Sequence, residues 1–173
     1  MSYLSLQGAP AVSDFRLTKL REQLSLEITD IQAITASYWH FAKCASDLDE
    51  LELEHLEVVL DYGPSRHELD VAGEHFLVIP RPGTISPWST KATDSAHHCG
   101  LQKIERIERG IVWHISTASG RLLEENEKAI VRTRIHDRMV EAVYDSLDKA
   151  ELLFDEHSPA SMRCVDVLAD GTQ

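Results

Sequence analysis

Two kinds of segment alternate along this chain of 173 residues: stretches with the composition of strands and stretches with the apolar spacing of helices. Residues 3–6, 28–44 and 75–79 are apolar, β-branched or aromatic, as in strands. Residues 10–26 and 123–147 place apolar side chains on one helical face. The first half therefore predicts strand, helix, long strand and helix, and the second predicts strand, helix, two strands and helix. This order predicts an α+β fold in which two similar half-domains form one largely antiparallel sheet with helices packed on one face.

The second helix of the first half is expected to begin near Ser46 or Asp47. Glu50 follows Asp47 by three residues, as in a capping box, and Gly63 with Pro64 ends the segment. The apolar stripe expected to be buried in this helix comprises Leu48, Leu51, Leu56, Val59 and Leu60.

The topology of the second half depends on how residues 101–147 are divided. Apolar residues recur at every third position from 101 to 107, as in a helix, but alternate with other residues from 111 to 115, as in a strand. With Gly110 between these segments, we predict two strands joined as a hairpin. Residues 123–147 predict one long helix, whose buried face comprises Val131, Ile135, Met139, Ala142, Val143 and Leu147.

The end of the sequence differs in composition from the rest. Residues 155–161 are polar, and a strand-like apolar run at 165–168 is followed by little further sequence against which it could pack. We therefore expect residues 1–149 to form one domain and residues 150–173 to begin a linker to a region that this sequence lacks.

The bulk composition limits the class of protein. The hydrophobic fraction of 43% and the charged fraction of 27% are typical of soluble globular proteins. No apolar run approaches the roughly 20 residues that cross a bilayer, and the first ten residues lack the pattern of a secretory signal, so we expect a cytoplasmic protein without a membrane partner. The net charge of −12 also disfavours nucleic acid as a partner, because its phosphates are bound chiefly by Lys and Arg.

The cysteines and histidines are the first candidates for chemistry. Cys44, Cys99 and Cys164 are far apart and outside any C-x-x-C pair, so we expect reduced thiols that bind no zinc. Asp94, His97 and His98 have the i, i+3 and i, i+4 spacing of a helical metal site, which leaves a free-standing small metal-dependent enzyme as an alternative. A nucleophilic Cys99 is disfavoured because the end of a helix destabilises a thiolate. The sequence therefore predicts no catalytic residue and no metal ligand, and a ligand-sensing regulatory module is the second alternative.

The stretch 81–94 combines rigid prolines, one glycine, hydroxyl groups and charges of both signs. Loops of this kind often carry binding functions. Because Ile85 and Trp88 are unusual in a solvated linker, the stretch either folds back onto its own core or meets a partner. We predict a docking loop that comprises Arg81, Pro82, Gly83, Thr84, Ser86, Trp88, Ser89, Lys91, Thr93 and Asp94.

The segment RPGTISPWSTKATDSAHHCGLQKIERIERG, residues 81–110, closely resembles the N-terminal domain of the large single-chain phosphoribosylformylglycinamidine synthases. The resemblance extends through the sequences YWHF at 38–41, LDYGP at 60–64, HDRM at 136–139 and ELLF at 151–154. Two departures are Ser95, where the family pattern has an apolar residue, and His98, where it has Asn.

The resemblance implies a domain similar to a dimer of the small subunit PurS, which helps to assemble the synthetase and glutaminase parts of the enzyme. It implies that these parts, in the same polypeptide, are the partners of this domain. The family converts formylglycinamide ribonucleotide to its amidine with ATP, magnesium and ammonia released from glutamine. Because the family's ATP site and glutaminase cysteine lie in later domains, the resemblance assigns no cofactor and no catalytic residue to this chain.

Overall fold

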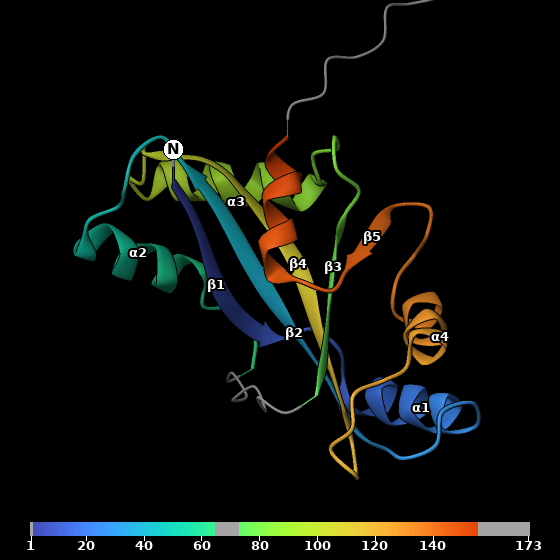
Figure 1. The fold of residues 1–173 in the computed structure, drawn as a ribbon. Helices are drawn as coiled ribbons and strands as arrows, with labels where there is room; N and C mark the ends of the chain where they lie inside the picture. Colours follow the sequence, from blue (N-terminus) through green and yellow to red (C-terminus); the bar gives the residue numbers. More distant parts are fainter. Residues whose placement is uncertain (1, 65–72, 156–173) are drawn as a thin grey trace, which may run out of the picture.

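The computed structural model describes residues 2–64 and 73–155, in which strands and helices follow a repeated order (Figure 1). The first half comprises β1 (Ser2–Pro10), α1 (Asp14–Ser25), β2 (Ile31–Cys44) and α2 (Glu50–Leu60). The second half comprises β3 (Glu74–Pro80), α3 (Pro87–His98), β4 (Ile104–Thr117) and α4 (Glu125–Ile135). These halves are followed by the short strand β5 (Glu141–Tyr144) and the 3-10 helix η1 (Leu147–Phe154).

The strands form one sheet in the order β1-β2-β4-β3-β5, and every neighbouring pair is antiparallel. The two strands of 14 residues, β2 and β4, pair along their length, with Tyr38 opposite Ile111 near the middle. Each half thus contributes one strand-helix-strand-helix unit, and the two units meet at the β2–β4 pair. The predicted α+β fold with two similar halves in one antiparallel sheet is confirmed.

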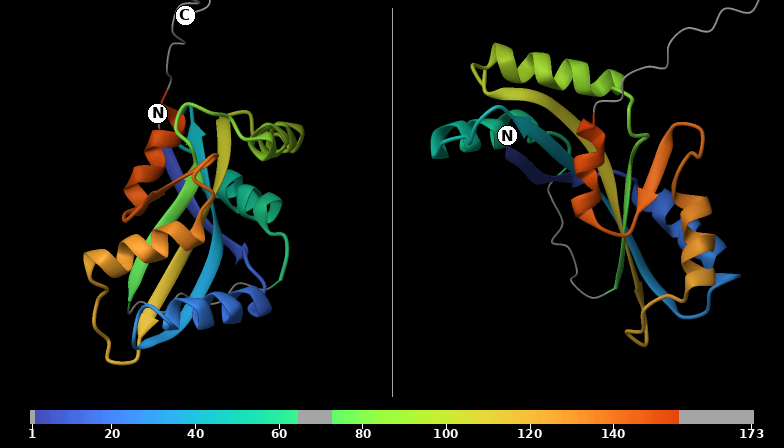
Figure 2. Two further views of the ribbon diagram at one scale, coloured as in Figure 1. Left: turned by 90° about the vertical axis from the view of Figure 1, so that its right-hand side faces the viewer. Right: turned by 45° about the horizontal axis from the view of Figure 1, so that its top comes forward.

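Alternation of side chains along the strands separates the two faces of the sheet. Phe76 of β3 contacts the core under α1 and α4, whereas the next residue, Leu77, contacts η1 on the opposite face. Ala36 and Ala42 of β2 lie six positions apart, hence on one face, and contact the α1/α4 core and the α2/α3 core respectively. The four α-helices therefore share one face and η1 covers the other. The strands twist strongly, so the two helix pairs diverge (Figure 2).

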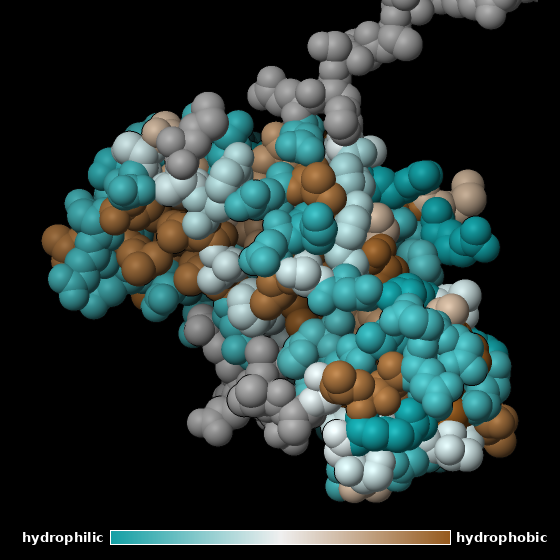
Figure 3. All heavy atoms as spheres, in the orientation of Figure 1, coloured by the Kyte–Doolittle hydropathy of each residue, from teal (hydrophilic) through white to brown (hydrophobic). Residues whose placement is uncertain are grey.

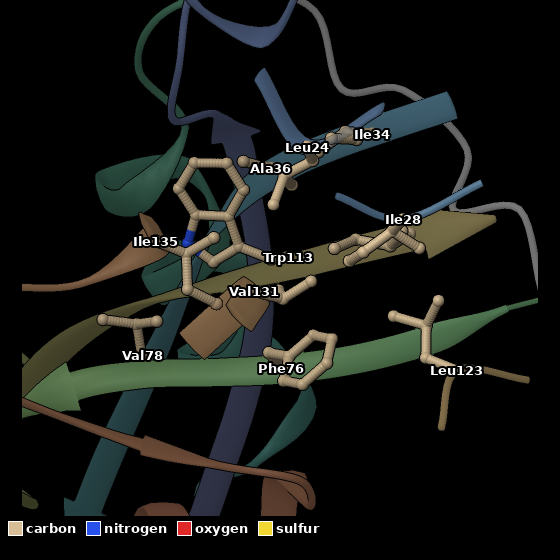
Figure 4. Packing of buried hydrophobic residues seen from close by; sticks show 11 residues of the cluster. Leu24, Ile28, Ile34, Ala36, Phe76, Val78, Trp113, Leu123, Val131 and Ile135 are labelled. Carbon is tan, nitrogen blue, oxygen red and sulfur yellow. The ribbon is translucent and has the colours of Figure 1, made fainter. Parts of the chain in front are cut away.

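The core under α1 and α4 surrounds Trp113 of β4 (Figure 4). Leu24 comes from α1, whereas Val131 and Ile135 come from α4, four positions apart and hence on one face of that helix. Leu24 and Val131 are completely buried. The apolar residues that recur with helical spacing in these segments are therefore the ones that pack in this core.

Helix α2 begins later than predicted. Its N-cap is Asp49, whose side chain accepts a hydrogen bond from the N–H of Glu52 at 2.9 Å, while the Glu52 carboxylate accepts one from the N–H of Asp49 at 2.9 Å. Leu56 and Leu60 are buried as predicted. Leu51 is 77% exposed, so its predicted burial is wrong. It lies five positions, or about 140° around an α-helix, from Leu56.

The predicted hairpin around Gly110 is also wrong. β4 is one continuous strand, and Gly110 pairs with Trp39 in its interior. A Cβ atom at Gly110 would lie 2.8 Å from the Cγ2 atom of Ile79 and 2.9 Å from the carbonyl oxygen of Val78. Glycine is therefore required here by the close approach of β3 and not by a turn.

The predicted long helix 123–147 is divided in the structure. α4 ends at Ile135, and residues from Glu141 form β5 against β3. Between them, the Asp137 side chain accepts a hydrogen bond from the N–H of Met139 at 2.8 Å, which favours a turn over a helix. Met139 is 79% exposed, so its predicted burial is wrong.

The first helix begins later than predicted. Pro10 pairs with Ser37 at the end of β1, and α1 begins only at Asp14. At the other end, Leu153 and Phe154 of η1 are buried against the sheet. The strand-like run 165–168 lies outside the described residues.

Candidate functional site

Residues 81–84, the start of the predicted docking loop, form a tight turn directly after β3. The N–H of Thr84 donates to the carbonyl oxygen of Arg81 at 3.2 Å, and the Thr84 hydroxyl donates to the same oxygen at 2.6 Å. Pro82 stands at the second position, and Gly83 at the third has a φ of 83°. Proline followed by a residue with positive φ is the requirement of a type II turn, so the Pro-Gly pair specifies this shape.

A buried carboxylate fastens this turn to β4. The Glu108 side chain is 0% exposed and accepts hydrogen bonds from the N–H and the hydroxyl of Ser86, at 3.2 and 2.8 Å. Arg106 forms an ion pair with Glu108 and also donates to the carbonyl oxygen of Thr84 at 2.8 Å. Neither residue is among the sites predicted from the sequence, because the predicted hairpin divides β4. Their i, i+2 spacing was the available signal, since it places opposite charges on one face of a strand.

Helix α3 follows the turn immediately, so the predicted loop 81–94 is helical from Pro87 onward. Ser86 is the N-cap and accepts a hydrogen bond from the N–H of Ser89 at 3.0 Å. Ser89 is only 1% exposed, and the Thr93 hydroxyl accepts a hydrogen bond from the N–H of Ile107 at 2.9 Å. Ser89 and Thr93 therefore attach α3 to the body of the domain.

The two large apolar residues of the stretch differ in exposure. Trp88 is half-buried and packs against the core between α2 and α3, whereas Ile85 is 65% exposed. Trp88 therefore folds back onto the core, whereas the side chain of Ile85 is presented to solvent. The predicted docking residues that share the exposure of Ile85 are Arg81, Gly83, Thr84, Lys91 and Asp94.

An aromatic cluster surrounds Arg109 beside Trp88. The Cζ atom of Arg109 lies 4.1 Å from the ring centroid of Tyr38 and 4.7 Å from that of Trp88. Arg109 also donates to the Tyr62 hydroxyl at 3.1 Å, and that hydroxyl lies 2.7 Å from Nε2 of His40. Burial raises the pKa of Tyr62, so its hydroxyl remains protonated at neutral pH. It accepts from Arg109, and the direction of its hydrogen bond with His40 depends on the tautomer of the His40 ring.

Two adjoining hollows lie on the helical face of the sheet. The smaller, about 220 Å³, is lined by residues that include Tyr38, Ser86, Trp88 and Arg109. The larger, about 700 Å³, is bordered by α1 and by the end of α4. Both hollows have Tyr38, Ile111 and Glu141 in their walls. We name the two together the central cleft.

Asp94, His97 and His98 do not converge on a common point. Nε2 of His97 donates to the carbonyl oxygen of Ile104 at 2.6 Å, and Nδ1 of His98 donates to the backbone carbonyl oxygen of Asp94 at 2.7 Å. Within residues 2–64 and 73–155, no group of three or more His, Cys, Asp or Glu side chains is placed to hold a metal ion. This arrangement gives no support to the metal-dependent alternative.

The described cysteines are both free. Cys44 is buried, which raises the pKa of its thiol, and Cys99 is exposed at the C-cap of α3. Cys164 lies outside the described residues. Among the helices that the structure describes, none has the length and apolar character needed to cross a membrane.

Two strand-helix-strand-helix units, joined through their long strands and followed by a turn held on a buried carboxylate, define an α+β domain of duplicated architecture. A family model described as "Formylglycinamide ribonucleotide amidotransferase N-terminal" matches residues 37–154, from β2 to the end of η1. The match includes the turn, Glu108 and the whole Arg109 cluster. The chain belongs to this family, as the resemblance implied, and therefore to purine biosynthesis.

Proposed function

We propose that this chain is the docking and assembly domain of the amidotransferase and takes no direct part in the reaction. Its partners are the synthetase and glutaminase regions of the same polypeptide. Those regions bind ATP and magnesium, release ammonia from glutamine, and convert formylglycinamide ribonucleotide to its amidine. The enzyme acts in the cytoplasm, where this domain holds the two regions in position. The domain contributes no cofactor ligand.

The observation that carries this proposal is the exposed and fixed turn at residues 81–85. Ile85 is 65% exposed although the segment is held on both sides, by the Arg81–Thr84 hydrogen bonds and by Ser86 on Glu108. A rigid apolar projection loses little conformational entropy when it binds, which favours association. The polar and charged neighbours Arg81, Thr84 and Lys91 supply a rim. We name this surface the docking turn.

The proposal is tested by introducing a charge at the centre of the docking turn. Ile85→Asp in the complete enzyme is compared with Leu122→Asp, because Leu122 is 64% exposed and precedes α4, outside the docking turn. We expect Ile85→Asp to lower glutamine-dependent synthesis about tenfold, the factor that corresponds to 1.4 kcal/mol. Synthesis from added ammonia should fall less, because it does not need coupling between the two active sites.

The stability of the domain serves as the internal control. Both substitutions replace an exposed side chain, so each should change the free energy of unfolding by no more than about 0.5 kcal/mol. The docking role is refuted if Ile85→Asp leaves glutamine-dependent synthesis equal to that of Leu122→Asp.

A further inference from the structure

Arg109 differs from the ion-paired cations in the described part of the chain because its partners there are aromatic. Ion pairs join Lys43 to Glu105, Lys103 to Glu52, Arg106 to Glu108, Arg121 to Glu127, Lys128 to Glu74, Arg132 to Asp145 and Arg134 to Glu27. No described carboxylate lies within ion-pair distance of Arg109, although the chain carries a net charge of −12. A half-buried cation that lacks a counter-ion among these residues is a candidate receptor for an anion from outside the domain.

The guanidinium group is held in place while several of its donors remain available. Tyr38 and Trp88 contact it through their ring faces, which fixes the plane without using N–H groups. Tyr62 accepts the one side-chain hydrogen bond that Arg109 forms among the described residues. A guanidinium has five N–H donors, so a second anionic acceptor can still be bound in the bidentate geometry that carboxylates favour.

The surroundings of Arg109 add positive charge. Arg16 and Lys19 of α1 border the larger hollow of the central cleft, and neither has a carboxylate partner among residues 2–64 and 73–155. Two carboxylates, Asp137 and Glu141, also border the cleft, but each accepts a hydrogen bond from the turn between them: from the N–H of Met139 and from the N–H of Asp137. Charges of both signs therefore border the cleft, and the positive ones outnumber the negative ones, which favours the approach of an anion.

The size and place of the hollow define the kind of anion. About 220 Å³ beside Arg109 is smaller than the roughly 300–1,000 Å³ of typical small-molecule pockets, and it has room for one side chain. Ser86 lines this hollow and also carries the docking turn. A protein segment seated on the docking turn would therefore extend directly over Arg109.

We propose that Arg109 binds an Asp or Glu side chain of the synthetase or glutaminase region, which enters the central cleft between the two helix pairs. This inference rests on the proposed docking function and adds the chemistry of the partner. This carboxylate forms an ion pair with Arg109, while the Tyr62 hydroxyl keeps its hydrogen bond with the guanidinium group. A carboxylate metabolite and an inorganic phosphate are the other occupants that the experiment separates.

The test places a reactive amine at position 109 of the complete enzyme. Arg109→Lys keeps the positive charge, and carbodiimide then joins the introduced amine to a contacting carboxylate as an amide. Digestion and mass spectrometry identify the joined residues. We expect an amide between the side chain introduced at position 109 and an Asp or Glu outside residues 1–155, absent from the enzyme that retains Arg109, and unaffected by added phosphate or citrate.

The contrary results are equally specific. An amide from position 109 to Glu141 or to another acidic residue of 1–155, or no amide at all, overturns the inference. Because citrate and phosphate also consume carbodiimide, the other amides in the same digest serve as the reference. Selective loss of the amide at position 109 on addition of phosphate or citrate, with those other amides retained, assigns the site to a small anion and overturns the inference too. Lys91 in the same digest separates the two proposals, because an amide from Lys91 to another region would preserve the docking turn even if position 109 formed none.

A second measurement needs no substitution. Phenylglyoxal modifies accessible arginine side chains, and Arg138 is an exposed reference on the turn after α4. We expect Arg109 to be modified in the 173-residue chain and protected in the complete enzyme, relative to Arg138. Equal modification of Arg109 in both would overturn the inference independently of whether Arg109→Lys folds.

Discussion

The backbone N–H and the hydroxyl of Ser86 both donate to the carboxylate of Glu108, 22 positions away in the sequence. This contact joins the beginning of α3 to the interior of β4. Because Glu108 is completely buried and paired with Arg106, it stabilises the docking turn without taking part in its surface. The exposed turn is thus fastened to β4 by a residue that is itself completely buried.

Removal of this carboxylate should destabilise the domain strongly. Glu108→Ala leaves Arg106 and the donors of Ser86 without their acceptor, so we expect a loss of about 3–5 kcal/mol in the free energy of unfolding. Denaturant titration measures it. The matched control is Glu105→Ala. The Glu105 side chain is 38% exposed, so its ion pair with Lys43 should contribute at most about 1 kcal/mol. Equal losses in the two variants would show that Glu108 is not the anchor.

Because α4 ends at Ile135, substitution by Asp should affect stability very differently at Met139 and at Val131. Met139 is 79% exposed, so Met139→Asp should change the free energy of unfolding by about 0.5 kcal/mol or less. Val131 is fully buried in the core around Trp113, and Val131→Asp should unfold the domain because an unpaired buried carboxylate is costly. Circular dichroism melts of the two variants measure the difference. An unfolded Met139→Asp would contradict the division of the predicted long helix, and a folded Val131→Asp would contradict the burial of Val131 in this core.

Glu127 should make the domain sensitive to acid. Arg121 donates to both oxygens of this carboxylate, at 2.7 and 2.8 Å, and holds the pKa of Glu127 at about 2. Because the folded pKa lies below the usual 4.5, the contribution to stability is complete above about 4.5 and is lost as the pH falls toward 2. Glu127→Gln should therefore be less stable than the parent at pH 7. The gap should narrow between pH 4.5 and 2, and a gap that stays constant across this range would contradict the assignment.

His75 should make the stability of the domain depend on pH in a different range. Burial and the neighbouring ring of His114, 4.8 Å away between centroids, lower the pKa of His75 below its usual 6.5. Because the unfolded state then takes up the proton first, the domain should lose stability as the pH falls below about 6.5. His75→Gln should reduce this loss between pH 7.5 and 5.5, measured by urea titration at each pH. An unchanged pH dependence would exclude His75 as its source.

Local signals predicted most of the architecture. The β-branched composition of residues 28–44 predicted β2, and the pair Pro82-Gly83 is the chemical requirement of the turn that the structure contains. The errors arose where a tertiary contact outweighed the local signal. The local sequence predicts a turn at Gly110, whereas the approach of Ile79 requires glycine there within a strand.

The cluster around Arg109 could not be predicted from the sequence. Tyr38 and Arg109 are 71 positions apart and meet only because β2 and β4 pair in one register, with Trp39 opposite Gly110. No periodicity or motif encodes that register. The exposure of Ile85 beside the half-buried Trp88 likewise depends on where α3 begins, since the composition of the stretch 81–94 is compatible with either residue in the core.

Surface apolar groups are not confined to the docking turn. Figure 3 shows apolar side chains at its left, where α2 lies, and Leu51 and Val58 of that helix are 77% and 72% exposed. These two residues provide internal references for any measurement of contact. A change in accessibility at Ile85 that is matched at Leu51 and Val58 would report general shielding by the rest of the enzyme.

Hydroxyl-radical footprinting can show whether the docking turn meets another region of the enzyme. Oxidation of Ile85 is measured relative to Leu122, because the two side chains are 65% and 64% exposed in this domain. We predict similar oxidation of both in the 173-residue chain and selective protection of Ile85 in the complete enzyme. If Ile85 and Leu122 remain equally oxidised in the complete enzyme, the docking turn is not an interface and the proposed docking function is wrong.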